Sequence, residues 1–165
     1  IEKALSNKSC VILEDLYRVN QKTNRIMRQH DLFKKYGYIP NNRPDNKDLP
    51  ENELKGLYVF AEKLKNGSFN PCYTGISGSI YMRLRQHGWF NRHNDATLAY
   101  LQASTKEKQK YNRENFPTEL IKEQQRIIRK YAVVIIPEKE DFDLHFMEVY
   151  LSGKLKTKWN SYKTH

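Results

Sequence analysis

The sequence predicts an α+β fold: a small antiparallel three-stranded sheet flanked by helices, with an N-terminal helical arm. Two short apolar segments joined by an Asn-Gly turn predict a hairpin, and a later β-branched run that ends at a proline predicts the third strand. Helical spacing of apolar residues between and after these segments predicts the helices. At 165 residues the chain is long enough for one domain with its own core and short for two.

The first third of the chain is expected to form the helical arm. Apolar residues recur at roughly helical spacing over residues 9–36, as in Val11, Leu16 and Val19. Prolines and Asn/Asp residues between positions 40 and 50 predict a loop. We therefore expect an arm and loop over residues 1–54 and a main domain over 55–165. The basic side chains of the arm fit either a solvated face or a face that contacts nucleic acid.

The hairpin opens the main domain. Leu57–Ala61 and Cys72–Ile76 are the expected strands, and Asn66-Gly67 between them accepts the positive φ that a tight turn requires. Because side chains alternate along a strand, Gly56 and Tyr58 share one face.

The rest of the main domain is expected to be mostly helical, with a polar loop or frayed helix over residues 105–116. The expected helices cover residues 79–87 with Gly88 as the stop, 95–103 capped by Asp95, 117–130 from Pro117, and a last helix that begins at Asp141 or Asp143. The third strand is expected at Tyr131–Ile136, closed by Pro137.

Charge and cysteine content narrow the function classes. Lys and Arg number 29 against 19 Asp and Glu, which gives a net charge of +10. This charge favours a polyanionic partner such as nucleic acid, although a soluble protein can also simply be basic. Cys10 and Cys72 make neither a disulfide framework nor a zinc site, and no run suggests a membrane span or signal peptide. We expect a cytoplasmic protein that does not enter a membrane.

A set of polar and aromatic residues follows the hairpin in a fixed order. Tyr73 and Gly75 share a strand face, so both phenols can lie on one side of the hairpin. Arg83 and His87 are four residues apart and therefore share a helix face. At these residues the chain resembles the GIY-YIG nuclease superfamily, over about residues 55–162. The matching positions are Gly56-Leu57-Tyr58, Tyr73-Thr74-Gly75, Arg83, His87, Glu148 and Asn160. Leu57 and Thr74 depart from the commonest pattern but point away from the tyrosines.

The resemblance implies a phosphodiesterase site. Tyr58 would activate water; a free phenol has a pKa near ~10, so nearby positive charge from Arg83, His87 or a metal would have to lower it. Tyr73 would donate a hydrogen bond to the scissile phosphate, and Arg83 would stabilise the charge of the transition state. Glu148 would be the sole protein ligand of Mg²⁺ or Mn²⁺.

The resemblance further implies that Asn160 supports the site and that double-stranded DNA is the substrate. The basic residues Lys154, Lys156 and Lys158 fit either a solvated face or phosphate contacts that join Arg83 in binding the DNA, and a nuclease site nearby favours the contacts. A restriction-type or a phage or mobile-element endonuclease, bacterial or phage-encoded, fits so compact a chain, and a repair or structure-specific nuclease stays open. Cutting both strands would need a homodimer or two successive reactions.

Other readings stay open. A non-catalytic nucleic-acid-binding module could keep the fold, and Tyr58 taken singly also fits a core aromatic. Asp45, Glu53 and Lys55 spell the PD-ExK pattern of another nuclease class, although Asp45 lies in a loop where that chemistry needs adjacent strands.

Overall fold

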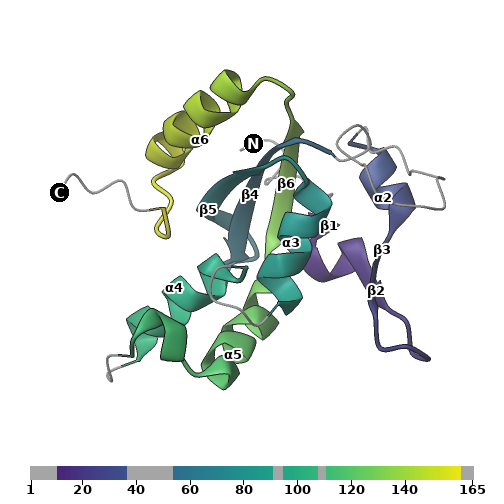
Figure 1. The fold of residues 1–165 in the computed structure, drawn as a ribbon. Helices are drawn as coiled ribbons and strands as arrows, with labels where there is room; N and C mark the ends of the chain where they lie inside the picture. The colour runs from purple at the N-terminus through teal and green to yellow at the C-terminus, as the bar shows by residue number, and fades with distance from the viewer. Residues whose placement is uncertain (1–10, 37–53, 91–94, 108–110, 161–165) are drawn as a thin grey trace.

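A four-stranded antiparallel sheet of order β1-β6-β4-β5 lies between helices (Figure 1). The structure, a computed structural model, describes residues 11–36, 54–90, 95–107 and 111–160. The strands of the sheet are β1 (Val11–Ile12), β4 (Gly56–Lys63), β5 (Phe69–Ser77) and β6 (Ala132–Pro137). The longer helices are α3 (Ile80–Trp89), α4 (Thr97–Lys106), α5 (Thr118–Ile128) and α6 (Asp141–Leu155). A short 3₁₀ helix, η2 (Arg113–Asn115), precedes α5.

The predicted hairpin is confirmed. β4 and β5 pair with Tyr58 opposite Gly75 and Phe60 opposite Tyr73. At the turn Gly67 has a φ of +84°, a conformation that glycine adopts without strain. The Asn66 side chain accepts the backbone N–H of Ser68 at 3.0 Å and so closes the turn.

The N-terminal segment differs from the prediction, and the sheet therefore has four strands rather than three. Val11 and Ile12 pair with Val133 and Ala132 of β6, so the first apolar pair adds an edge strand. The continuous helix expected over residues 9–36 is not found in the described part of that range, where only His30–Lys34 is α-helical. Instead, the segment forms η1 (Leu13–Leu16), β2 (Tyr17–Val19), β3 (Ile26–Arg28) and α2 (His30–Lys34).

The physical reason lies in which partners these residues find. Leu13 and Leu16 are both fully buried, and their spacing of three residues fits one 3₁₀ turn. The two β-branched residues before them, Val11 and Ile12, pair with strand β6, so these residues do not form a helix with the apolar residues that follow. Leu16, Tyr17 and Phe33 join the main core. The division at residue 54 stays a prediction, since the expected loop lies largely outside the described residues.

Several helix ends also differ from the sequence prediction. Gly88 does not stop α3, which continues to Trp89. Asp95 does not cap α4, which begins at Thr97 and reaches into the segment expected as loop. Pro117 precedes α5 as its N-cap, and that helix ends at Ile128 rather than near residue 130.

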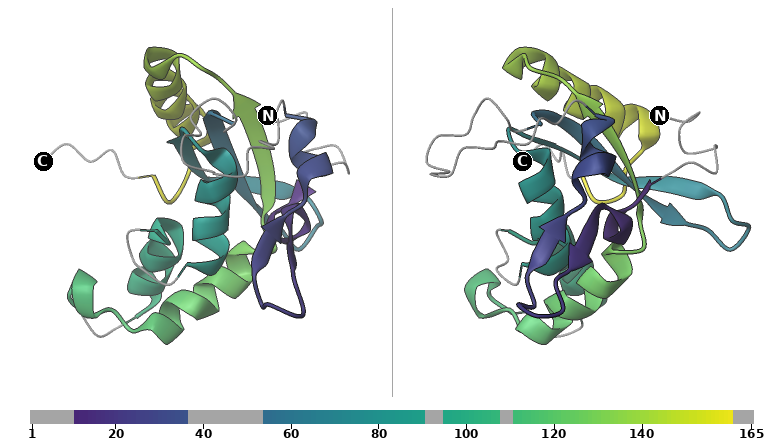
Figure 2. Two further views of the ribbon diagram at one scale, coloured as in Figure 1. Left: turned by 45° about the vertical axis from the view of Figure 1, so that its right-hand side comes forward. Right: turned by 90° about the vertical axis from the view of Figure 1, so that its right-hand side faces the viewer.

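The sheet separates helix α6 on one side from α3, α4 and α5 on the other (Figures 1 and 2). On one face Tyr58 and Phe60 pack in the main core, which also includes buried residues of α3, α4 and α5. On the other face Leu57 and Val59 pack against Leu144 of α6. The candidate site lies on the first face, and α6 reaches it from the other side of the sheet.

Candidate active site

Strand alternation brings the two predicted tyrosines together. Tyr58 on β4 and Tyr73 on β5 have ring centroids 6.3 Å apart on the same face. Gly75 lies directly opposite Tyr58, and a Cβ at that position would overlap the Tyr58 hydroxyl and ring. Glycine is therefore required for the Tyr58 side chain to lie across β5.

Helix α3 supplies the imidazole and the guanidinium. His87 is fully buried, and its Nε2 lies 2.8 Å from the Tyr58 hydroxyl in a buried hydrogen bond. The His87 ring also contacts Tyr73, with ring centroids 5.5 Å apart. Arg83, one turn earlier, acts on the pKa of both phenols through its charge and hydrogen bonding. The two side chains thus share the helix face that their spacing predicts.

The Arg83 guanidinium is held by groups that the sequence analysis did not single out. Its Nη1 donates to Gln86 Oε1 and to the Asp95 carbonyl, each at 3.0 Å, and its Nη2 donates to Thr97 Oγ1 at 3.1 Å. Gln86 could have been found from its three-residue spacing to Arg83 on a helix. Thr97 comes from the start of α4, and no local pattern points to it.

Burial sets the protonation of Tyr58 and His87. It raises the pKa of Tyr58 well above the ordinary phenol value; Tyr73 and Glu148 act in the same direction, and Arg83 opposes them. Burial also lowers the pKa of His87 well below 6.5, with a further lowering by Arg83. Both groups are therefore neutral at pH 7. The expectation that His87 supplies positive charge to lower the pKa of Tyr58 is wrong, because desolvation outweighs the effect of nearby charge.

Tyr73 and Arg83 keep protons that they can donate. Burial raises the pKa of Tyr73, so its phenol is protonated across the neutral range. Burial acts to lower the pKa of Arg83, but the two phenols outweigh it and the pKa is raised. A protonated phenol and a guanidinium side by side form a set of donors suited to an anion.

Glu148 brings a carboxylate to the same site from α6. It is half-buried, and burial raises its pKa, with a smaller opposing effect from His145. Its charge raises the pKa of both Tyr58 and Tyr73, which places it within electrostatic range of the phenols. Among ion pairs of the described residues, none joins Glu148 to Lys154. The carboxylate therefore lies near the phenols, and no ion pair among the described residues includes it.

Asn160 is tied to the backbone of β5 between Tyr73 and Gly75. Its Oδ1 accepts the Thr74 N–H at 2.7 Å, and its Nδ2 donates to the Thr74 carbonyl at 2.8 Å. The preceding Trp159 N–H donates to the Cys72 carbonyl at 3.0 Å. The segment after α6 thus pairs with the edge of the sheet and fixes the strand that carries Tyr73.

The remaining sequence candidates lie apart from this cluster. Lys154, Lys156 and Lys158 are exposed on and after the end of α6, and the Lys158 ammonium lies 4.6 Å from the centre of the Trp159 ring. Lys55 of the PD-ExK pattern forms an ion pair with Asp141 at 2.8 Å. Its expected partners, Asp45 and Glu53, lie outside the described residues.

Comparison of the chain with family models, with curated proteins and with solved structures finds no match. Within the part of the chain that the structure describes, no helix combines the length and apolar character needed to cross a bilayer. The tyrosine cluster comprises Tyr58, Tyr73, Arg83 and His87, and Glu148 lies within electrostatic range of its two phenols.

Proposed function

We propose that the chain is a divalent-metal-dependent endonuclease that hydrolyses the phosphodiester bonds of DNA. The observation that carries the proposal is the buried hydrogen bond between Tyr58 and His87, with Tyr73 and Arg83 in the same cluster. A phenol bonded to a neutral imidazole can exchange protons, and the adjoining donors suit a phosphate. The net charge of +10 and the resemblance to GIY-YIG nucleases support the same class of substrate.

Water activation is a proton relay in this proposal. Tyr58 takes a proton from the attacking water as its own proton passes to Nε2 of His87, which is neutral before the reaction. The hydroxide forms the new bond to phosphorus, and the bond to the leaving oxygen breaks. His87 then carries a positive charge beside Arg83, and the negative charge of the bound phosphate offsets this unfavourable state.

Tyr73 and Arg83 stabilise the charge that develops on the phosphate. Tyr73 donates its phenolic proton in a hydrogen bond, and Arg83 supplies a fixed positive charge. The bonds from Arg83 to Gln86 and Thr97 hold the guanidinium in place before substrate arrives. Asn160 supports the site indirectly, by fixing the backbone of β5.

Glu148 fits a site for Mg²⁺ or Mn²⁺. Its half-buried carboxylate offers hard oxygen donors beside the phenols. The described residues hold no group of three or more metal-ligating side chains, so water and phosphate oxygens would complete the coordination shell. A bound divalent ion would supply Lewis-acid stabilisation of the leaving oxygen. The chain's own part is then to hold the ion at one carboxylate.

Double-stranded DNA is the substrate we propose, with the exposed Lys154, Lys156 and Lys158 as phosphate contacts away from the tyrosine cluster. One tyrosine cluster cuts one strand at a time, so a double-strand cut requires a homodimer or two successive reactions. The alternative is a DNA-binding module that lacks hydrolytic activity. A module that binds DNA without cutting it is expected to have lost Tyr58, Arg83 or Glu148, and the presence of all three therefore favours the enzyme.

Incubation of the purified chain with supercoiled plasmid in Mg²⁺, in Mn²⁺ or in chelator tests the proposal. We expect nicked and linear DNA with either metal ion and intact plasmid in chelator. Binding of the plasmid without cleavage under all metal conditions would identify the binding module instead.

A further inference from the structure

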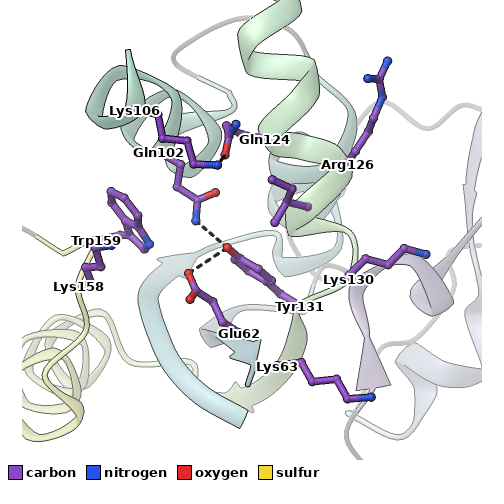
Figure 3. A pocket seen from close by; sticks show the side chains of 11 residues that line it. Glu62, Lys63, Gln102, Lys106, Gln124, Arg126, Lys130, Tyr131, Lys158 and Trp159 are labelled. Carbon is purple, nitrogen blue, oxygen red and sulfur yellow. Dashed lines mark hydrogen bonds between the residues drawn. The ribbon is translucent and has the colours of Figure 1, made fainter. Parts of the chain in front are cut away.

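A second polar site lies on the same face of the sheet as the tyrosine cluster. It is a pocket of about 630 Å³ between β4, α4, α5, the turn before β6 and the segment after α6 (Figure 3). Glu62 at its floor lies four residues beyond Tyr58 on β4, which corresponds to about 13 Å along the strand. The volume is in the range of pockets that hold a small organic ligand.

The rim of this pocket is strongly basic. Its cationic side chains come from four different segments and are Lys63, Lys106, Arg126, Lys130 and Lys158, against the single carboxylate of Glu62. Of these cations, only Lys130 forms an ion pair among the described residues, and its partner is Glu14. The other four leave a positive field over the mouth, which favours a phosphate.

The floor is polar and has a fixed orientation. Tyr131 donates its one hydroxyl proton to Glu62 at 3.0 Å, so it accepts from Nε2 of Gln102 at 2.9 Å (Figure 3). This fixes the Gln102 amide, whose Oε1 is buried and has no hydrogen-bond partner in the described part of the chain. Gln102 is only 2% exposed. The floor therefore presents the carboxylate of Glu62, and the buried Gln102 amide behind it fixes the Tyr131 hydroxyl.

An aromatic ring forms the wall nearest the active site. Trp159 lines the pocket, and its buried Nε1 also finds no partner among the described residues. The same residue pairs through its backbone with Cys72, and the next residue, Asn160, pairs with Thr74 beside Tyr73. The pocket and the tyrosine cluster thus share one segment of chain.

We propose that this pocket binds one unpaired nucleotide of the DNA substrate, with its phosphate at the basic rim and its base against Trp159. The inference rests on the proposed nuclease function and adds the substrate class: DNA with an unpaired nucleotide near the bond that is cut. The Glu62 carboxylate at the floor matches the exocyclic amino group of cytosine, adenine or guanine, as a carboxylate does with cytosine N4. Thymine has no such group and should bind less well.

Fluorescence of Trp159 tests this directly. The chain has two tryptophans, so a Trp89→Phe variant leaves Trp159 as the reporter. In chelator, which prevents metal-dependent cleavage, we would titrate a duplex with one unpaired cytidine, the same duplex fully paired, and the duplex with thymidine at the unpaired position. Deoxycytidine monophosphate and inorganic phosphate serve as free competitors.

We expect the unpaired cytidine to quench Trp159 and to bind more tightly than the paired duplex by about five- to 150-fold, the range of one base stacked on an aromatic ring. Lys106→Ala should weaken this binding and flatten its salt dependence, with a loss of about 0.7 in the log–log slope. Lys139→Ala, an equal charge change at an exposed lysine away from the pocket, should leave both unchanged.

Equal binding of paired and unpaired duplexes, or an equal effect of the two lysine variants, would overturn the inference. Quenching by the free mononucleotide without any preference among the duplexes would overturn it too, because the ligand would then be a free nucleotide. Equal competition by inorganic phosphate and the mononucleotide would show that the base is not read. No outcome depends on cleavage, so the plasmid assay can fail while this experiment succeeds, and the reverse.

Discussion

Removal of the Tyr58 hydroxyl by Tyr58→Phe separates a catalytic phenol from a core aromatic. The ring stays, together with its contact to Phe60 at 5.6 Å between centroids, so the packing of the sheet face is kept. The change removes one oxygen and with it the 2.8 Å hydrogen bond to His87. The Nδ1 atom of His87 already has no partner among the described residues, so the variant leaves both imidazole nitrogens unsatisfied.

The expected loss of stability and the expected loss of cleavage differ in size. One lost hydrogen bond that leaves a buried polar atom unpaired lowers the free energy of unfolding by about 1–3 kcal/mol. Cleavage should fall much further, by about 10²- to 10⁴-fold, because the relay loses the group that takes the proton from water. DNA binding should stay near wild type, since the phosphate contacts belong to Arg83, Tyr73 and the basic surface.

Single-turnover cleavage of one labelled DNA substrate measures this loss apart from binding. Tyr17→Phe is the matched control: Tyr17 is 4% exposed, and its hydroxyl donates to the Tyr81 carbonyl, so it loses a buried hydroxyl remote from the phenol–imidazole pair. It should lose stability and cleave normally. A Tyr58→Phe variant that cleaves at the wild-type rate would refute the reasoning.

Further changes test the other parts of the site. Glu148→Gln should abolish metal-dependent cleavage yet leave the melting temperature equal or slightly higher, because burial raises the pKa of this carboxyl and the charge is unfavourable in the folded state; normal cleavage would exclude it as the metal ligand. The pKa of His87 is lower folded than unfolded, so stability should fall as pH drops below about 6.5, by at most about 1.4 kcal/mol per pH unit. Urea midpoints between pH 7 and 5 measure this slope, which His87→Gln should remove. Gly75→Ala should displace Tyr58 and lower both stability, by about 1–3 kcal/mol, and cleavage, while Gly153→Ala in open space should lower neither; equal effects in the two variants would contradict the close approach.

The hairpin and the shared face of Tyr58 and Tyr73 could be predicted from the sequence, because turn chemistry and strand alternation act between residues close in the chain. The Asn-Gly turn sets the register, and the register sets which residues share a face, so Tyr58 and Tyr73 could be placed together before any tertiary contact was known. The four-residue spacing of Arg83 and His87 predicted their shared helix face for the same reason. These are the parts of the site that one hairpin and one helix determine.

Tertiary contacts decided what the sequence patterns could not. Val11 and Ile12 have helical spacing to later apolar residues, but pairing with β6 makes them a strand. The protonation of Tyr58 and His87 likewise depends on how fully the helices cover the sheet, and burial reverses the expected pKa shift of the phenol. The pocket at Trp159 joins residues from distant segments, and no sequence spacing relates them.

The neutral state of Tyr58 and His87 constrains how the site can work. A phenolate formed before substrate arrives would need a lowered pKa, and burial raises it. A bound phosphodiester adds negative charge, which makes a Tyr58 phenolate still less favourable but makes a His87 imidazolium more favourable. In the mechanism that we propose, proton transfer to His87 is therefore coupled to the presence of the substrate. Burial keeps Tyr58 and His87 neutral in the free protein, and the charge of a bound phosphate would favour the transfer.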